Sequence, residues 1–123
     1  MNDRLTFRFF NTKANKYMPA QYVDETTVFL LARLGGDKYI IEQCTGLKDK
    51  NGNFIYEGDI VKRHSKYDEE EKDVMLQVEW NYKGGRYITT DKKHDTWFFS
   101  MFEYEYEILG NIHENPELLE DNK

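Results

Sequence analysis

The sequence predicts a mainly β, barrel-like fold with one or two short helices. Short segments rich in β-branched and aromatic residues alternate with turn signals such as Gly35-Gly36, Asn51-Gly52 and Gly84-Gly85. Aromatic side chains make up 15% of the 123 residues and supply the large apolar area that a core of short strands needs. We therefore expect one folded domain, residues 1–123, because disordered chains are poor in aromatic residues.

The N-terminal half of the chain is expected to contribute four strands. They cover residues 5–10, 17–23, 27–34 and 38–44. The third has an alternative, since Asp24 can cap a helix that Gly35 would end. We favour the strand because the glycine pair at 35–36 leads straight into the short β-branched segment at 39–41.

The C-terminal half is expected to contribute four more strands and a short helix. The strands cover residues 60–64, 74–81, 86–90 and 105–112. Within the second of these, alternation places on one face Val74, Leu76, Val78 and Trp80. Residues 97–103 are expected to form a helical turn, and Asn115-Pro116-Glu117 predicts the start of a helix.

Charge and cysteine usage restrict the classes of partner and compartment. The formal net charge of −6 opposes bulk binding to phosphate backbones, while leaving room for a local basic patch. Cys44 is the single cysteine, so no intrachain disulfide forms, and we expect it to be buried as a small apolar residue. The longest apolar run, 28–32, is far shorter than the roughly 20 residues of a membrane span. We expect a cytoplasmic protein with no membrane contact.

Two long motifs carry a family likeness. Residues 45–61 read TGLKDKNGNFIYEGDIV, and residues 104–119 read YEYEILGNIHENPELL. In this order and spacing they resemble the two signatures of YopX-like phage proteins. A weaker echo lies in Phe7-Arg8-Phe9 and Lys16-Tyr17-Met18.

The resemblance implies origin and fold rather than chemistry. It implies a bacterial phage or prophage protein with an all-β fold of coiled sheets that contains an SH3-like barrel. The family has no established biochemical activity, so no active residue carries over. The chain departs from the family at Phe9-Phe10, where Ala-Trp is frequent, and at His113, where an aromatic residue is common.

The favoured function is a non-enzymatic module that contacts a protein, either a second copy of itself or a host or phage protein. The first motif contains Gly46, Gly52 and Gly58, which predict unusual backbone angles. The candidate interaction loop comprises Thr45, Asp49, Asn51, Tyr56, Glu57 and Asp59, and the candidate surface comprises Tyr104 and Tyr106. The simpler interpretation is a shaped β-arch in which Asp59 accepts backbone hydrogen bonds.

The alternative function is the binding of single-stranded nucleic acid by the segment 82–99. Such binders combine aromatic platforms with a cationic groove. The candidate surface comprises Tyr82, Lys83, Arg86, Tyr87, Lys92 and Lys93, beside Trp97, Phe98 and Phe99. The aromatic residues serve equally well as core, and we favour that interpretation.

Catalysis is the least favoured class. A metal-assisted hydrolase would need His94 and His113 to meet beside Glu114, because the histidines lack the spacing of a zinc motif. The glycine pairs lack the pattern of a phosphate-binding loop. We therefore expect no enzyme, metal or cofactor, and we expect the charged run 68–73 to be a mobile loop.

Overall fold

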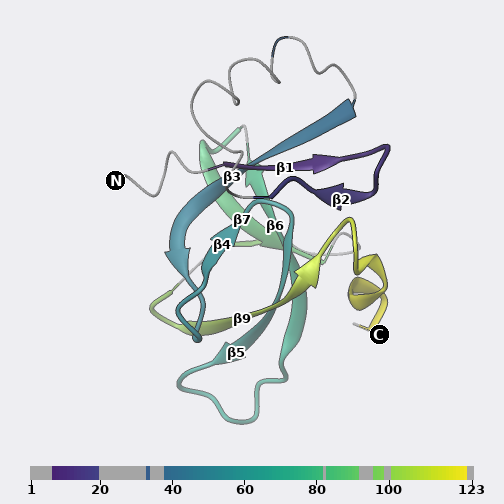
Figure 1. The fold of residues 1–123 in the computed structure, drawn as a ribbon. Coiled ribbons are helices and arrows are strands. Elements are labelled where there is room, and N and C mark those ends of the chain that lie inside the picture. The colour runs from purple at the N-terminus through teal and green to yellow at the C-terminus, as the bar shows by residue number, and fades with distance from the viewer. Residues whose placement is uncertain are drawn as a thin grey trace. The chain divides into compact units, whose positions relative to one another are not determined.

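The computed structural model describes residues 7–19, 33, 38–81, 83–91, 96–98 and 101–121, without the side chains of 96–98. The elements in this part are β1 (Phe7–Asn11), β2 (Lys16–Tyr17), β3 (Tyr39–Lys48), β4 (Phe54–Tyr56), β5 (Asp59–Ser65), β6 (Val74–Asn81), β7 (Arg86–Thr90), β8 (Thr96–Phe98), β9 (Tyr104–Asn111) and the 3₁₀ helix η4 (Pro116–Asp121) (Figure 1). The expected mainly β fold is confirmed.

The chain divides into two compact units, residues 1–44 and 45–123, and β3 runs from the first into the second. That one domain spans the chain stays a prediction.

The first unit is built on β1, which pairs antiparallel with β2 and with the first half of β3. Asn11 forms the turn after β1, because its Oδ1 accepts the N–H groups of the second and third residues beyond it, each at 3.0 Å. Phe9 and Phe10 are both buried, so the neighbouring residues of β1 are covered on both faces. Cys44 is also buried, as expected.

A buried carboxylate fastens this small sheet. Glu42 Oε1 accepts hydrogen bonds from Arg8 Nε at 2.7 Å and from the Tyr17 hydroxyl at 2.9 Å. The Arg8 guanidinium also lies 4.6 Å from the centre of the Tyr17 ring. The three side chains come from β3, β1 and β2, so the cluster joins all three strands of the unit.

Two expectations for the first unit need correction. The strand expected over 17–23 ends at Tyr17, and Met18 and Pro19 lie outside it, since proline has no N–H for a sheet ladder. Within 27–34 the structure describes Arg33, which is helical, so the expected strand is wrong at that residue. The other residues of these two segments lie outside the described part of the chain.

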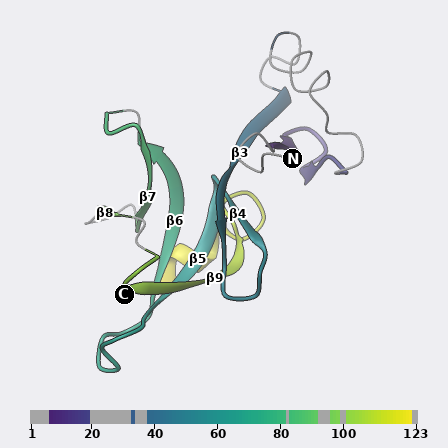
Figure 2. The ribbon, with the colours of Figure 1, turned by 90° about the vertical axis from the view of Figure 1, so that its left-hand side faces the viewer.

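The second unit is a curved antiparallel sheet in the order β8-β7-β6-β5-β9 (Figures 1 and 2). The expected strands 74–81 and 86–90 have the predicted bounds, and Gly85 takes a φ of 62° in the hairpin between them. The pairing of β5 with β9 slips by one residue between Ile60 and Val61, which leaves Leu109 as an extra residue on β9.

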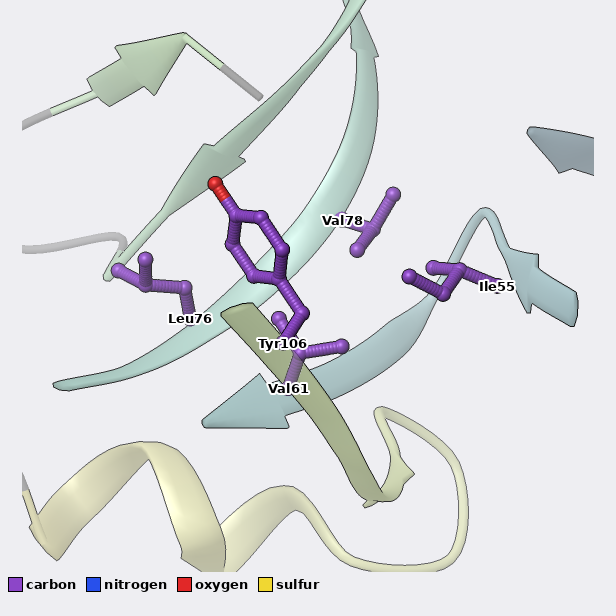
Figure 3. Packing of buried hydrophobic residues seen from close by; sticks show 5 residues of the cluster. All are labelled: Ile55, Val61, Leu76, Val78 and Tyr106. Atoms are coloured by element: carbon purple, nitrogen blue, oxygen red, sulfur yellow. The ribbon is translucent and has the colours of Figure 1, made fainter. Parts of the chain in front are cut away.

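The core of this unit gathers side chains from four strands (Figure 3). They are Ile55, Val61, Leu76, Val78 and Tyr106, each with no exposed surface. The predicted sharing of one face by Leu76 and Val78 is therefore confirmed. Burial of each such side chain contributes roughly 1.5–3 kcal/mol, so this cluster is the main apolar support of the sheet.

Three details of the second unit differ from expectation. Residues 97–103 were expected to be a helical turn, but Thr96–Phe98 pairs with β7 as a strand and 101–103 forms a turn. Strand β3 continues to Lys48 rather than ending at Cys44, and β4 was not expected. The pairing of β8 with β7 and of β4 with β3 sets these strands, and local residue preference does not reveal that pairing.

The C-terminal helix begins where its capping residues predict. The Asn115 carbonyl accepts the N–H of Leu118 at 3.1 Å, and its side chain accepts the N–H of Asn111 at 3.3 Å. The helix is of the 3₁₀ type and carries Glu117 in its first turn. Within the described residues, no helix is both long and apolar enough to cross a membrane.

Candidate functional site

Asp49, expected in an interaction loop, holds the loop together. Its side chain is 6% exposed. Oδ1 accepts the N–H groups of Asn51 and Asn53 at 3.0 and 2.9 Å, and Oδ2 accepts the N–H of Ile108 at 3.0 Å. A buried carboxylate that receives three backbone donors stabilises the fold and offers little to a partner. Asn51 is exposed in the turn.

Two further residues of the expected loop also bond to backbone. Thr45 Oγ1 donates to the Ile55 carbonyl at 2.8 Å. Asp59 is buried and accepts the N–H of Tyr56 at 2.7 Å, as the β-arch interpretation predicts. Tyr56 and Glu57 are half-buried. The positive φ angles of 83°, 83° and 89° expected at the three glycines of this motif are confirmed.

The two tyrosines expected on a contact surface face the core. Tyr106 has no exposed surface and packs in the central cluster, so its place on an accessible surface is wrong (Figure 3). Tyr104 is half-buried on the same face. The face follows from pairing, because Tyr106 lies opposite Arg63 and Ile108 opposite Val61, both inward-facing residues of β5.

The candidate nucleic-acid surface is only partly described. Lys83 and Arg86 are exposed at the β6–β7 hairpin. Tyr87 is half-buried with its ring edge-on to Trp80, at a centroid distance of 4.9 Å. Tyr82, Lys92 and Lys93 lie outside the described residues. The ring of Tyr87, which was expected to stack on bases, therefore packs against another ring of the sheet.

The proposed histidine cluster is not assembled by the described residues. Glu114 accepts a hydrogen bond from Asn111 Nδ2 at 2.8 Å, and the His113 N–H donates to Asn111 Oδ1 at 3.0 Å. His94 lies outside the described part of the chain. Among the residues that are described, no group of three or more ligand side chains is arranged to hold a metal ion.

A charged groove lies on the outer face of β5 and β9. It has a volume of about 260 Å³ and is lined by Lys50, Lys62, His64, Asp73, Glu105 and Glu107. Glu107 Oε1 lies 3.3 Å from Lys62 Nζ and 3.9 Å from Lys50 Nζ, and His64 Nδ1 lies 2.7 Å from Asp73 Oδ1. Charges of both signs pair with one another here, so the groove presents no single-sign field to a ligand.

An exposed aromatic pair is the most unusual feature of the described surface. Tyr67 is 72% exposed and Phe102 is 77% exposed. Their ring centroids lie 6.0 Å apart with a tilt of 44°. Tyr67 lies in the β5–β6 loop, the teal loop at the bottom of Figures 1 and 2, and Phe102 lies in the turn before β9. Two large rings side by side in water mark a contact surface more often than a single exposed apolar residue does.

Specific hydrogen bonds hold the two loops in this arrangement. The Lys66 N–H donates to the Glu103 carbonyl at 3.0 Å, and Lys66 Nζ donates to the Met101 carbonyl at 2.8 Å. Ser65 Oγ accepts the N–H of Asp68 at 3.0 Å within its own loop. These hydrogen bonds fix the backbone on either side of the rings, which lowers the entropy that a partner's binding would cost. That residues 68–73 form a mobile loop stays a prediction.

Exposed carboxylates lie close to the pair in the sequence. We define the aromatic tip as the two rings together with these exposed acidic side chains, namely Tyr67, Phe102, Asp68, Glu69, Glu70 and Glu103. Within the described residues, no ion pair joins Asp68, Glu69 or Glu70 to a cation. The tip is therefore an apolar centre with an acidic margin.

The neighbouring carboxylate, Glu71, instead contacts Arg63 and Tyr104. The Arg63 guanidinium lies 4.2 Å from the centre of the Tyr104 ring and 3.7 Å from Glu71 Oε2. The Tyr104 hydroxyl donates to Glu71 Oε1 at 3.5 Å. Desolvation raises the pKa of Tyr104, Arg63 lowers it, and the Glu71 hydrogen bond and charge raise it further. This cluster ties the base of the loop to β5 and β9.

These features define a small, mostly β protein with an exposed pair of aromatic rings. The chain belongs to the YopX protein family, whose model matches residues 11–120. The crystal structure of protein EF1440 from Enterococcus faecalis is similar, with 24% identity, a TM-score of 0.60 and coverage of 94% of this chain and 99% of that one. Protein yopX from Bacillus subtilis is also similar, at 20% identity, a TM-score of 0.56 and coverage of 96% and 98%. A comparison with curated proteins finds no match.

The residues of the aromatic tip were missed by sequence reasoning. Tyr67 stands inside the charged run Lys66–Asp73, and Phe102 precedes Glu103. A large apolar residue isolated among charged residues has no apolar neighbours in the sequence to pack against. This pattern could have indicated an exposed ring. Their pairing was not visible, because it depends on contacts between segments 35 residues apart.

Proposed function

We propose that this chain is a non-enzymatic module that acts through protein contacts made by the aromatic tip. The exposure of Tyr67 and Phe102, at 72% and 77%, is the observation that carries the proposal. Aromatic side chains supply much of the binding energy in protein interfaces, surrounded by a polar rim. The tip has this composition, since it combines two exposed rings with exposed carboxylates close to them in the sequence.

The order of the two loops supports the same proposal. Lys66 joins the β5–β6 loop to the turn before β9 through both its N–H and its ammonium group. A loop whose shape is already fixed loses less conformational entropy on binding. The Arg63–Glu71 pair adds a connection from the loop to the interior of the sheet.

The family likeness supports a setting for this activity. We propose that the chain is encoded by a phage or prophage and works in the bacterial cytoplasm. We further propose that its curved five-stranded sheet forms the SH3-like barrel that the resemblance implies. A second copy of the chain is one admissible partner, because isologous contacts between exposed patches are common.

The test compares proteins retained by the wild type, by Y67S/F102S and by L109S in a bacterial host. Leu109 is 37% exposed on the same unit, so L109S is a control that removes a smaller exposed apolar side chain outside the tip. We expect at least one protein to be retained by the wild type and L109S and depleted on Y67S/F102S. Light scattering of the three purified proteins identifies the case in which that protein is the chain itself. Equal retention by all three, with equal mass in solution, would contradict the proposal.

Single-stranded oligonucleotides form the counter-test. Titration of the wild type with a labelled oligonucleotide at low salt reports the alternative function. Salt-dependent binding that K92E/K93E weakens and Y67S/F102S leaves unchanged would favour the nucleic-acid interpretation over the protein contact.

A further inference from the structure

We infer that the occupant of the aromatic tip is a lysine- or arginine-rich segment of a partner protein. This inference rests on the proposed function and adds the chemistry of the partner. A cation contributes both attraction to the ring faces and attraction to the acidic margin. The contacts of the described residues support each part separately.

The chain covers other aromatic rings with its own cations. In the described part, four such pairs have a cation 4.2–5.3 Å from a ring centre: Arg8 on Tyr17, Lys38 on Tyr39, Lys48 on Phe54 and Arg63 on Tyr104. No described cation lies over Tyr67 or Phe102. The tip therefore offers ring faces of the kind that this chain elsewhere fills with lysine or arginine.

The nearest lysine in the sequence is committed to another contact. Lys66 Nζ donates to the Met101 carbonyl at 2.8 Å. This hydrogen bond fastens the turn that carries Phe102, so a move of the ammonium group toward either ring would release that turn. The hydrogen bond from Lys66 to Met101 thus holds the turn in place and keeps the Lys66 ammonium group away from the rings.

The charge of the margin favours a cation over other occupants. The segment 66–73 carries five carboxylates and two lysines. Glu71 and Asp73 pair with Arg63 and His64, so the unpaired negative charge falls on the residues that follow Tyr67. An acidic peptide or a phosphate backbone would meet repulsion at this margin, and a neutral apolar segment would gain nothing from it.

Lysine and arginine also suit the apolar centre. Their methylene stems cover apolar surface while the charged head stays in water, and a guanidinium stacks on aromatic faces. Two rings tilted by 44° with centroids 6.0 Å apart offer more than one face to such side chains. A segment with several cations can therefore engage the rings and the carboxylates together.

The probe is a flexible nine-residue peptide with three arginines separated by glycine and serine, matched to a peptide with citrulline in place of each arginine. Citrulline keeps the shape of the side chain and removes its charge. Binding is followed by ¹H–¹⁵N chemical-shift changes in the full chain. We expect the arginine peptide to shift the amides of Tyr67, Phe102 and their neighbours, and the citrulline peptide to bind about tenfold more weakly.

Matched variants assign the binding to the rings and to the charge. Y67S/F102S is expected to abolish the shifts, and urea unfolding checks that it remains as stable as the wild type. E69Q/E70Q is expected to weaken binding about fivefold, whereas E117Q/E120Q, which removes the same charge from exposed positions on η4, leaves it unchanged. Raising the salt concentration is expected to weaken the arginine peptide more than the citrulline peptide.

Each other outcome overturns the inference in a distinguishable way. Equal binding of both peptides would replace the cationic partner with an apolar one and leave the proposed function standing. Concentration-dependent shifts at the tip without peptide would identify a second copy as the occupant. Absence of shifts with both peptides overturns the cationic partner, and it overturns the proposed function as well only if Y67S/F102S also retains every partner of the wild type.

Discussion

Asp49 and Ile108 lie 59 residues apart in the chain, and the Ile108 N–H donates a hydrogen bond of 3.0 Å to Asp49 Oδ2. The Lys50 N–H donates to the Tyr106 carbonyl at 2.8 Å beside it. The first residue of each pair belongs to the motif 45–61 and the second to the motif 104–119. The two stretches that carry the family likeness are therefore in direct contact, and one buried carboxylate connects them.

Replacement of Asp49 should lower the free energy of unfolding substantially. D49A leaves three backbone N–H groups without their acceptor, and we expect a loss of about 3 kcal/mol. Asp68 is the control, since it accepts one N–H in an exposed turn, and D68A should lose less than about 1 kcal/mol. Urea denaturation measures both variants. Losses of similar size would show that the three hydrogen bonds of the buried Asp49 carboxylate contribute little.

Truncation of a core tyrosine should cost far more stability than truncation of a tyrosine at the tip. Y106A removes a fully buried ring, and we expect a loss of about 4 kcal/mol of unfolding free energy. Y67A removes a ring that is 72% exposed and should change stability by less than about 0.5 kcal/mol. Thermal or urea unfolding of the two variants measures both changes in the free energy of unfolding. A stable Y106A protein would contradict the packing around this ring.

Gly110 and Asn115 should show energetic coupling. A Cβ added at Gly110 would lie 2.6 Å from Asn115 Cγ, so one side chain must shift. We expect G110A to cost about 2 kcal/mol, and N115G to cost about 1 kcal/mol because it removes the acceptor of the Asn111 N–H. In the double variant the clash disappears, and the cost of G110A should fall by about 1 kcal/mol or more. Strict additivity of the two costs would refute the close approach.

Tyr104 should make stability fall at high pH. Burial raises its pKa in the folded state, so the folded protein binds this proton more tightly than the unfolded chain does. The contribution is complete below the ordinary tyrosine pKa of about 10 and is lost as the pH rises through the folded value. Urea unfolding of the wild type and Y104F near pH 8 and above pH 10 gives the difference. Y104F should lose less stability over that interval, and a parallel decline would contradict the prediction.

Local alternation was sufficient for the centre of the sheet. Strand β6 and its hairpin with β7 were predicted with their observed bounds, because large apolar residues recur at every second position from Val74 to Trp80 and a glycine pair marks the turn. Strand β3 was predicted too short. Gly46, with its φ of 83°, reads as a bend in the sequence, whereas pairing carries the strand on to Lys48.

The site depended on contacts that local patterns do not contain. Tyr104 and Tyr106 alternate with glutamates and so share one face of the strand, but which face lies inside is decided by the pairing of β9 with β5. The contact of Tyr67 with Phe102 requires two loops joined by Lys66. Asp49 was identified from the sequence as a loop residue, and its bond to β9 gives it a structural role instead.

The extra residue at Leu109 gives the C-terminal motif a fixed length as well as a fixed composition. On one side of it Tyr106 points into the core, and on the other Gly110 lies against Asn115. Removal of Leu109 would restore plain alternation and exchange the sides of every later residue of the strand. Evolutionary change at Leu109 should therefore proceed by substitution. Deletion of its codon would turn Gly110 to the other side of the strand and remove the contact with Asn115, next to the start of the helix.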